Sequence, residues 1–256
     1  MDEIFKTPFL LRVSLGVVPG CSIFTQKMGN DDIDMATVPE DLWKFGGELV
    51  YSLTADIDTI SSDSELDVGN NILIQGLDSN WNFVSQIAVS NGMNKVSLET
   101  PLIRSLYERN LGSALTGNIY EYVDTDINLG IPIDSTKVRG YIKMTDNRSF
   151  RSHYSVPANH VGYLVYANEG LDNFQTTSAT AIWCSRLFGG DFVNQNKIAL
   201  NTDATSFVER VFSTYEPIPE KTDIVVKCDY TSANNVGISG TFSVLQIGKD
   251  WIQHYR

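Results

Sequence analysis

Histidine and serine side chains often carry acid–base, nucleophilic or metal chemistry in proteins. In this sequence they do not form a recognisable motif. The three histidines, His153, His160 and His254, share no metal-ligand spacing with one another or with a cysteine. Ser239 lies in GISG, which lacks the GxSxG spacing of a nucleophile elbow and falls within an expected strand. These patterns predict surface or strand histidines, and they favour neither a metal centre nor a hydrolase triad.

Two aspartate pairs have the DxD spacing that can ligate calcium or serve a glycosidase: Asp56 with Asp58, and Asp124 with Asp126. Neither pair continues into a loop with a closing Glu and a required Gly, and acidic loop ends are common in so acidic a chain. The sequence also contains no Walker loop or dinucleotide fingerprint. We therefore expect no catalytic, cofactor-binding or metal-binding residues, no cofactor and no enzymatic activity, with a depolymerase as the enzymatic alternative.

The cysteines Cys21, Cys184 and Cys228 are odd in number, widely spaced and without a CxxC motif. This pattern argues against a disulfide framework or a zinc site and predicts buried free thiols in a reducing compartment. The stretch VPGC, ending at Cys21, looks like a lipoprotein cleavage box, but Arg12 interrupts the apolar run before it. No segment approaches the ~20 apolar residues that span a bilayer, so we expect no membrane association.

The charge balance bears on possible partners. The chain carries 19 Lys plus Arg against 31 Asp plus Glu, a formal net charge of -12. A nucleic-acid-binding surface gains its affinity by placing cations against phosphates, so this acidity disfavours direct contact with DNA or RNA. With 256 residues and 42% hydrophobic content the chain can bury a sizeable core, and typical domains of ~100–150 residues suggest two units.

Two further features bear on carbohydrate, either attached to the protein or bound by it. The sequon Asn147-Arg148-Ser149 is a formal glycosylation site, which acts only in a secretory pathway. Trp81 is expected in a turn, where an exposed indole could stack on a sugar ring. A tryptophan folded back over its own hairpin is the commoner outcome.

The elements that must position these residues read as short strands separated by turns. In residues 72–92, ILIQGLDSNWNFVSQIAVSNG, an apolar run meets a polar turn at Asp78. From Phe83 onward apolar and polar residues alternate with the two-residue period of a strand, up to the hairpin pair Asn91-Gly92. A third strand begins at Val96, so the stretch predicts a β-meander.

Similar runs recur along the rest of the chain, beginning with GELVYSLT at 47–54. Only residues 102–111 offer a helical pattern, and a strand fits them equally well. The predicted fold class is therefore all-β, with two adjoining β-sandwich or jelly-roll-like units at 46–145 and 146–256. The polar stretch MTDNRS supplies the junction near 140–150.

Residues 1–45 lack this strand texture. They carry apolar residues without a clean period, which is too apolar a composition for a solvated tail. We expect an extended N-terminal assembly arm, ordered mainly by another copy or by a different protein. Its large rings are Phe5, Phe9, Phe24, Trp43 and Phe45.

Several stretches in succession also carry a resemblance to known proteins. They are VPGCSIFTQKMGNDDID, EDLWKFGGE, IQGLDSNWNFVSQIAVSNG, YSVPANHVGYLVYAN, FGGDFVNQNKIAL and PIPEKTDIVVKCDYTSANNVGISGTFSVLQI. This order resembles a family of little-characterised virion-associated proteins of tailed bacteriophages, abundant in aquatic and marine phages. The resemblance covers nearly the whole chain, and its motifs are turn and packing residues, so it brings no catalytic residue with it.

The resemblance implies a non-enzymatic structural protein of the virion, made in the cytoplasm of the host bacterium. It implies a homo-oligomer that contacts other virion proteins, either major capsid or tail proteins. The favoured role is a capsid decoration or cement component that assembles through its N-terminal arm. The alternative is a tail or fibre-associated adaptor that binds a host surface glycan. Copy number separates the two, because a shell component is present in hundreds and a tail component in a few to tens.

Overall fold

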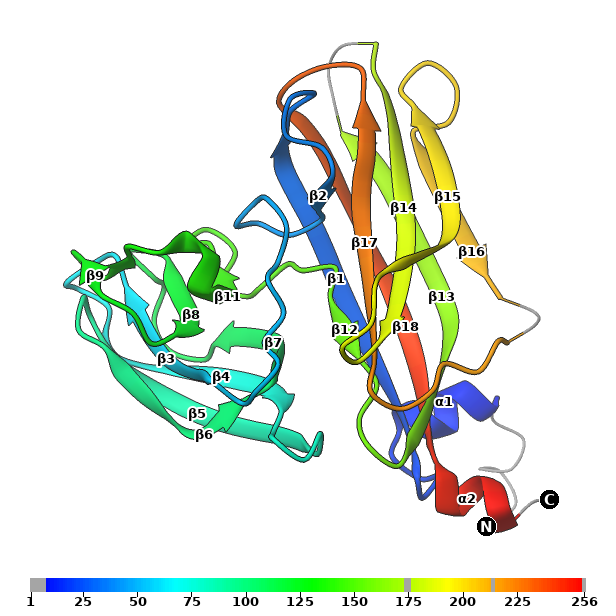
Figure 1. The fold of residues 1–256 in the computed structure, drawn as a ribbon, viewed down its shortest axis with the longest axis horizontal. Helices are drawn as coiled ribbons and strands as arrows, with labels where there is room; N and C mark the ends of the chain where they lie inside the picture. Colours follow the sequence, from blue (N-terminus) through cyan, green and yellow to red (C-terminus); the bar gives the residue numbers. More distant parts are fainter. Residues whose placement is uncertain (1–7, 173–175, 213–214, 255–256) are drawn as a thin grey trace.

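Two β-sandwiches of unequal size lie side by side in the computed structural model, which describes residues 8–172, 176–212 and 215–254 (Figure 1). The all-β prediction is confirmed, since the helical elements of the described residues are short. They are α1 (Phe9–Ser14), the 3-10 turn η2 (Ser135–Lys137) and α2 (Lys249–His254). No helix in these three ranges is long and apolar enough to cross a membrane.

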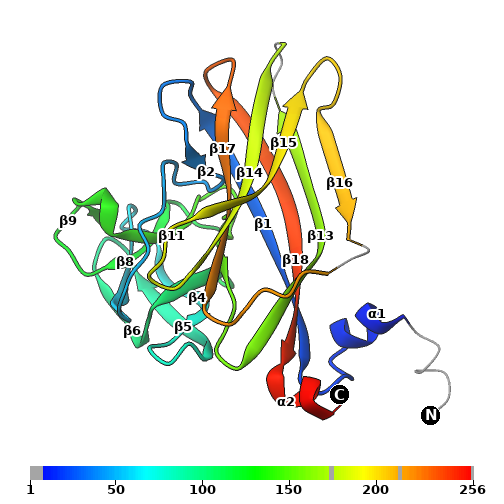
Figure 2. The same ribbon diagram turned by 45° about the vertical axis from the view of Figure 1, so that its right-hand side comes forward.

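The larger sandwich packs two antiparallel sheets face to face (Figure 2). One sheet has the order β1 (Cys21–Ile33), β18 (Val236–Gly248), β13 (His160–Asp172) and β16 (Phe207–Val211). The other has the order β12 (Tyr154–Ser155), β17 (Thr222–Thr231), β14 (Ser178–Leu187) and β15 (Val193–Asn201), with β2 (Glu40–Asp41) paired to β17. Apolar side chains from both sheets fill the space between them, as the two-residue period of a strand requires.

The smaller sandwich is built from the chain between β2 and β12. One sheet has the order β11 (Val138–Ile142), β8 (Ile119–Val123), β3 (Ile57–Ser62) and β6 (Val96–Leu102). Facing it are β5 (Phe83–Asn91), β4 (Val68–Leu77) and β7 (Arg104–Asn110), and a small hairpin joins β9 (Ile127–Asn128) to β10 (Ile131–Pro132). The chain thus leaves the larger sandwich after β2 and returns to it before β12.

The predicted meander is correct for its first two strands and wrong for the third. β4 and β5 form an antiparallel hairpin whose turn is held by Asp78, which accepts the backbone N–H groups of Asn80 and Asn82 at 2.8 and 2.9 Å. β6 instead pairs with β3 in the facing sheet. The Gln86 amide bridges the gap, because it both donates to and accepts from the backbone of Thr100. Of the other expected elements, 102–111 contains the strand β7, whereas 47–54 contains no strand.

The predicted assembly arm is wrong for its described residues. β1 pairs with β18 from Cys21 opposite Ile247 to Ile33 opposite Val236, so it is a full strand of the larger sandwich. The side chains of Met28 and Ile33 are completely buried in that core. The strand was hidden in the sequence because polar residues interrupt its alternation and its partner lies at the other end of the chain. Residues 1–7, including Phe5, lie outside the described residues.

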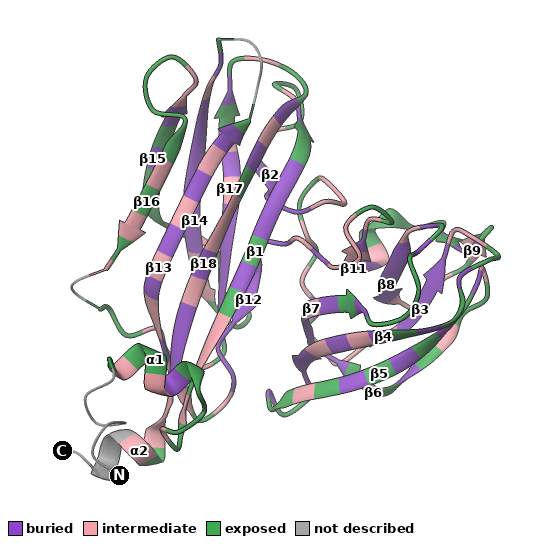
Figure 3. Cartoon of the chain, turned by 180° about the vertical axis from the view of Figure 1, so that it is seen from behind, coloured by how far each residue is buried: buried purple, intermediate pink, exposed green. Residues whose placement is uncertain are grey.

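Burial follows the layers. In Figure 3 the long strands of the larger sandwich are mostly buried or intermediate, whereas β5 and β15 carry exposed stretches. Buried residues are also found where the two sandwiches meet, on β7 and β12. We call this contact region the seam; it is formed by β1, β2, β12 and β17 of the larger sandwich, by β7, β8 and β11 of the smaller one, and by the connecting segments 42–56 and 143–153.

Candidate functional site

The seam holds most of the buried charge of the molecule, which makes it the first place to look for chemistry. It begins with the polar residue Gln26 on β1, whose side chain is buried. Its amide nitrogen donates to the carbonyls of Leu106 at 2.8 Å and His153 at 2.9 Å. A glutamine on the same face of β1 as the core residue Met28 therefore ties this edge strand directly to β7 of the smaller sandwich.

The first ion-pair cluster centres on Asp223 of β17, which is completely buried. Arg104 of β7 donates to both carboxylate oxygens, from its Nε at 2.7 Å and from one Nη at 2.9 Å. Arg186 adds a contact of 3.1 Å, and the hydroxyl of Ser155 donates at 2.6 Å. The remaining Arg104 nitrogen donates to the carbonyl of Ser52 at 2.6 Å. Such a bidentate, fully bonded pair fixes the angle between the two sandwiches as well as their distance.

Trp81 belongs to this cluster and not to a sugar-binding surface. It has a φ of 65° in the β4–β5 turn and only 3% of its surface is exposed. The Arg104 guanidinium lies 4.9 Å from the centre of its ring, and the ring of Phe188 in the larger sandwich meets it at 5.0 Å. The indole therefore packs across the seam, where its stacking surface is covered.

The second cluster surrounds Arg151, which is almost completely buried. One of its terminal nitrogens donates to the Glu108 carboxylate at 2.7 Å and to the Ser105 hydroxyl oxygen at 2.8 Å. The other donates to the carbonyl of Arg139. The Ser105 hydroxyl also contacts a second carboxyl group, that of Glu121 on β8. Two carboxyl groups and one guanidinium thus share a serine, in a region that excludes solvent.

The two carboxyl groups of this cluster differ in charge. Burial raises the pKa of Glu121 well above its usual value, and the neighbouring Glu108 raises it further. Burial alone would raise the pKa of Glu108 as well, but the positive charge of Arg151 brings it below the usual value. Glu121 is therefore the neutral acid and Glu108 the carboxylate. Because Ser105 has one proton, it donates to Glu108 and accepts from Glu121.

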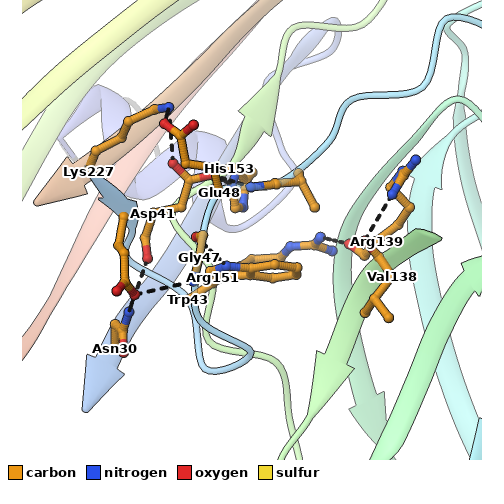
Figure 4. A network of polar contacts seen from close by, with 12 residues as sticks. Asn30, Asp41, Trp43, Gly47, Glu48, Val138, Arg139, Arg151, His153 and Lys227 are labelled. Carbon is orange, nitrogen blue, oxygen red and sulfur yellow. Dashed lines mark hydrogen bonds and ion pairs between the residues drawn. The ribbon is translucent and has the colours of Figure 1, made fainter. Parts of the chain in front are cut away.

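The third cluster joins β2, the segment 143–153 and β17 (Figure 4). Asp41 accepts from Nε2 of His153 at 2.8 Å and from the backbone N–H of Leu49 at 2.8 Å. Its other oxygen lies 3.5 Å from Nζ of Lys227, which also contacts the exposed Glu48. Figure 4 shows the lysine, the aspartate and the histidine in a row beside Arg151.

The protonation of this row follows from its burial. Burial lowers the pKa of His153, against the opposing effect of Asp41. Burial would raise the pKa of Asp41, but the charges and hydrogen bonds of His153 and Lys227 bring it below its usual value. At neutral pH the imidazole is therefore neutral, and its proton sits on Nε2 because that nitrogen faces a carboxylate acceptor.

A pair of carboxyl groups of which one is neutral and the other ionised, such as Glu121 and Glu108, can serve general acid–base catalysis when a substrate reaches it. Here the backbone of Gly140 packs directly against both carboxyl groups. Even a single Cβ atom added to this glycine would lie 2.0 Å from the Glu108 carboxylate and 2.3 Å from that of Glu121, so no substrate atom fits between them. The cavity beside Tyr51 and His153 has a volume of about 10 Å³, the space of roughly one water molecule. The seam can therefore hold charges and orient the two sandwiches, and this cavity is smaller than a substrate needs.

The remaining histidines and Ser239 lie apart from the seam. His160 bonds through Nδ1 to the carbonyl of Ala158 at 2.8 Å within its own turn. The backbone of His254 ends α2, and its side chain lies outside the described residues. Ser239 is an exposed residue in the middle of β18, as its sequence context predicts.

The two aspartate pairs approach each other at one edge of the smaller sandwich, where β3 pairs with β8. Asp58 accepts the backbone N–H of Asp124 at 3.1 Å, and Asp124 forms an ion pair of 2.6 Å with Lys95. Asp56 and Asp126 complete the two pairs but join no cluster. Within the described ranges no group of three His, Cys, Asp or Glu side chains could hold a metal ion.

The three cysteines are free thiols, with Cys184 and Cys228 buried and Cys21 partly exposed. The sequon folds into the junction between the sandwiches. Asn147 has a φ of 53° and its side-chain oxygen accepts from Asn110, while Ser149 is buried.

Sequence reasoning missed the role of His153, which it assigned to a surface or a strand. Its partner Asp41 lies 112 residues away, so no local spacing could reveal the pair. A weaker signal exists in β7, where RSLYERN places Arg104 and Glu108 two alternations apart on a strand that is otherwise buried. Charged residues on a buried strand indicate a polar interface.

Comparison with known proteins adds little to this geometry. No protein-family profile and no curated protein matches the chain. It is similar to the crystal structure of the infectious bursal disease virus VP2 subviral particle, with 11% identity and a TM-score of 0.23 over 95% of this chain and 78% of that one. The structure of the infectious bursal disease virus Gt strain gives 10% identity and a TM-score of 0.21, over 94% and 78%. A likeness at these TM-scores supports no argument about function.

Proposed function

We propose that this chain is a non-enzymatic structural protein of a phage virion, in the role of a capsid decoration or cement component. The observation that carries the proposal is the seam. Its buried ionisable groups have partners within the chain: Glu121 contacts Ser105 inside the smaller sandwich, and His153 bonds to Asp41 of β2 in the larger one. Such groups usually mark active sites, and here they hold a two-sandwich block in one shape.

A fixed shape suits a protein that acts by fitting its neighbours. The sequence resemblance to virion-associated proteins of tailed phages supports the same role. The net charge of -12 favours a station on the outside of the shell, because packaged DNA would repel it. Since β1 is a strand of the sandwich, the contact with other virion proteins must lie on the surface of the folded block.

The outward face of β5 is the surface that best fits such a contact. Phe83, Ile87 and Val89 point to the same side of this strand and are 46%, 56% and 51% exposed. Isolated apolar residues are common on protein surfaces, but a row of three on one strand forms a patch. A neighbouring protein of the particle that covers this row would bury it without disturbing the core.

Stoichiometry in purified virions tests the proposal. Quantitative mass spectrometry against the major capsid protein should find hundreds of copies per particle. A value of a few to tens would contradict the decoration role and favour the tail or fibre adaptor. The variant Ile87→Lys should fold normally yet fail to join particles, whereas Val193→Lys, at a residue 59% exposed on the larger sandwich, serves as the matched control.

A further inference from the structure

One side of the larger sandwich remains open between its two sheets. β15 and β16 are the last strands of their sheets on this side, and they do not pair with each other (Figures 1 and 2). Between them lies a cavity of about 480 Å³, which is also lined by the carboxylate residue Glu216 and by Pro217, Ile218 and Pro219. We call it the lateral cavity. Its size falls within the range of ~300–1,000 Å³ typical of small-molecule sites.

The lateral cavity has an apolar floor and a polar rim. Trp183, Ala167 and Ile224 line it and are buried, which places them at the bottom. Gln195 and Asn196 of β15 line it and are exposed, which places them at the mouth. Ligands can therefore enter from solvent and reach aromatic and aliphatic surface below.

One buried polar group in the lateral cavity has no partner. Thr222 lines the cavity from β17 and is 4% exposed. Its hydroxyl oxygen makes no hydrogen bond to any described residue, although its backbone carbonyl accepts the N–H of Val156 at 3.0 Å. At a cavity wall such a hydroxyl is free to form a hydrogen bond with a ligand.

A cation in the same cavity is also without a partner. Arg210 lies opposite Ala167 in the β13–β16 ladder and lines the cavity in a half-buried position. It forms no ion pair or hydrogen bond with any described residue, unlike Arg104 and Arg151 in the seam. The nearby Glu169 feels the charge of Arg210 but forms no ion pair with it, and one of its oxygens accepts from the indole N–H of Trp183 at 2.6 Å.

We propose that the lateral cavity binds one or two rings of a saccharide that carries a carboxylate, such as a uronic acid. The C–H faces of a sugar ring match the apolar floor, and its hydroxyls match the amides of Gln195 and Asn196 and the hydroxyl of Thr222. The carboxylate matches the guanidinium of Arg210, whose planar fork binds two oxygens at once. This inference goes beyond the proposed virion role and holds whether the protein occupies the shell or the tail.

Saturation-transfer NMR and titration with single sugars test the proposal on the full chain. The probes are sodium D-glucuronate, D-glucose, which has a hydroxymethyl group in place of the carboxylate, and sodium acetate. Glucuronate should bind at least about tenfold more tightly than glucose, because the charge-assisted contact with Arg210 adds to the ring contacts. Equal binding of the two sugars, or displacement of glucuronate by equimolar acetate, would overturn the proposal.

Variants locate the site. Arg210→Gln should weaken glucuronate binding about 10- to 100-fold and leave glucose unchanged, and Thr222→Val should weaken both sugars. Arg109→Gln, at an exposed arginine on the smaller sandwich, is the matched control and should bind like the wild type. If Arg210→Gln does not fold, Arg210→Lys keeps the charge without the fork and should lose most of the preference for glucuronate. Wild-type affinity in a folded Arg210 variant would refute the assignment.

Discussion

The seam and the lateral cavity differ in how they treat their arginines. In the seam, Arg104 meets Asp223 in two contacts and Arg151 meets Glu108 at 2.7 Å. In the lateral cavity, Arg210 has no such partner among the described residues. The difference teaches that burial and perturbed titration do not by themselves mark a site of action. An arginine without an ion-pair partner at an open cavity is the more specific sign, because unpaired polar atoms also occur in the closed seam, at Tyr51, Ser152 and His153.

The seam also shows what paired burial achieves. Moving charges out of water is expensive, and a good ion pair roughly offsets that penalty without a large surplus. The gain is geometric, because a bidentate contact such as Arg104 with Asp223 tolerates one relative orientation. We therefore expect the seam to set the shape of the block more than its stability, while removal of one partner should be severely destabilising.

Removal of β1 should have the largest effect. A variant without residues 1–40 loses the strand that pairs with β18, together with the core residues Met28 and Ile33. The larger sandwich should then lack cooperative unfolding in urea and lose its near-UV circular dichroism. An unchanged unfolding midpoint would show that β1 is dispensable and would restore the assembly-arm hypothesis.

Breaking the seam at one carboxylate should have the next largest effect. Asp223→Ala leaves the buried Arg104 and the partly buried Arg186 without their carboxylate, which should lower the free energy of unfolding by about 3–5 kcal/mol. Asp229→Ala is the control, because its pair with Lys197 is exposed and should contribute less than about 1 kcal/mol. Urea unfolding measures both. Similar losses in the two variants would mean that the seam is no more than a surface contact.

The protonation state of Glu121 can be read from the pH dependence of stability. Its raised pKa means that the folded protein keeps a proton which the unfolded chain releases above pH 4.5. The contribution of this group is therefore full below that pH and is lost as the pH rises, by up to about 1.4 kcal/mol per pH unit. Glu121→Gln cannot ionise and so does not suffer this loss. The free energy of unfolding of the variant, relative to that of the wild type, should therefore increase from pH 5 to pH 8.

The neighbouring carboxylate provides the control for that experiment. Glu108→Gln should be destabilised at neutral pH, because it removes the negative charge that faces Arg151. If the unfolding free energies of Glu121→Gln and the wild type run parallel from pH 5 to pH 8, Glu121 is ionised in the fold and the assignment of charges is wrong.

The smallest effect should come from the unpaired hydroxyl. Thr222→Val replaces a buried hydroxyl that has no partner with a methyl group of similar size, so stability should stay within about 1 kcal/mol or rise slightly. Ser155→Ala in the seam removes a hydroxyl that donates to Asp223 at 2.6 Å and should cost about 1–3 kcal/mol. A larger loss at Thr222 than at Ser155 would contradict the distinction between the two regions.

The sequence predicts those parts of the fold that depend on local chemistry. The turn at Asn91-Gly92 forms where expected, with a φ of 58° at Gly92, although the strand that follows it pairs in the facing sheet. Alternating residues identify the strand β5 in the same way. In each case the signal lies within a few residues of the structure it specifies.

The parts that escaped prediction depend on partners far along the chain. β1 looked irregular because Gln26 and Asn30 occupy positions that face the seam and the segment around Glu40, where polar groups are required. Nothing near Asp41 shows that His153 will lie against it. The lateral cavity is likewise invisible in the sequence, since it exists only where two sheet edges fail to meet.

The path of the chain has a consequence for synthesis on the ribosome. The smaller sandwich lies between β2 and β12 in the sequence, so all its strands emerge before most of the larger sandwich exists. Cys21 pairs with Ile247, so β1 must wait for nearly the last part of the chain before it finds β18. Contacts of such long sequence separation form late and leave strand edges exposed meanwhile. We therefore expect the inserted sandwich to fold first and to present β7 as the surface on which the larger one is completed.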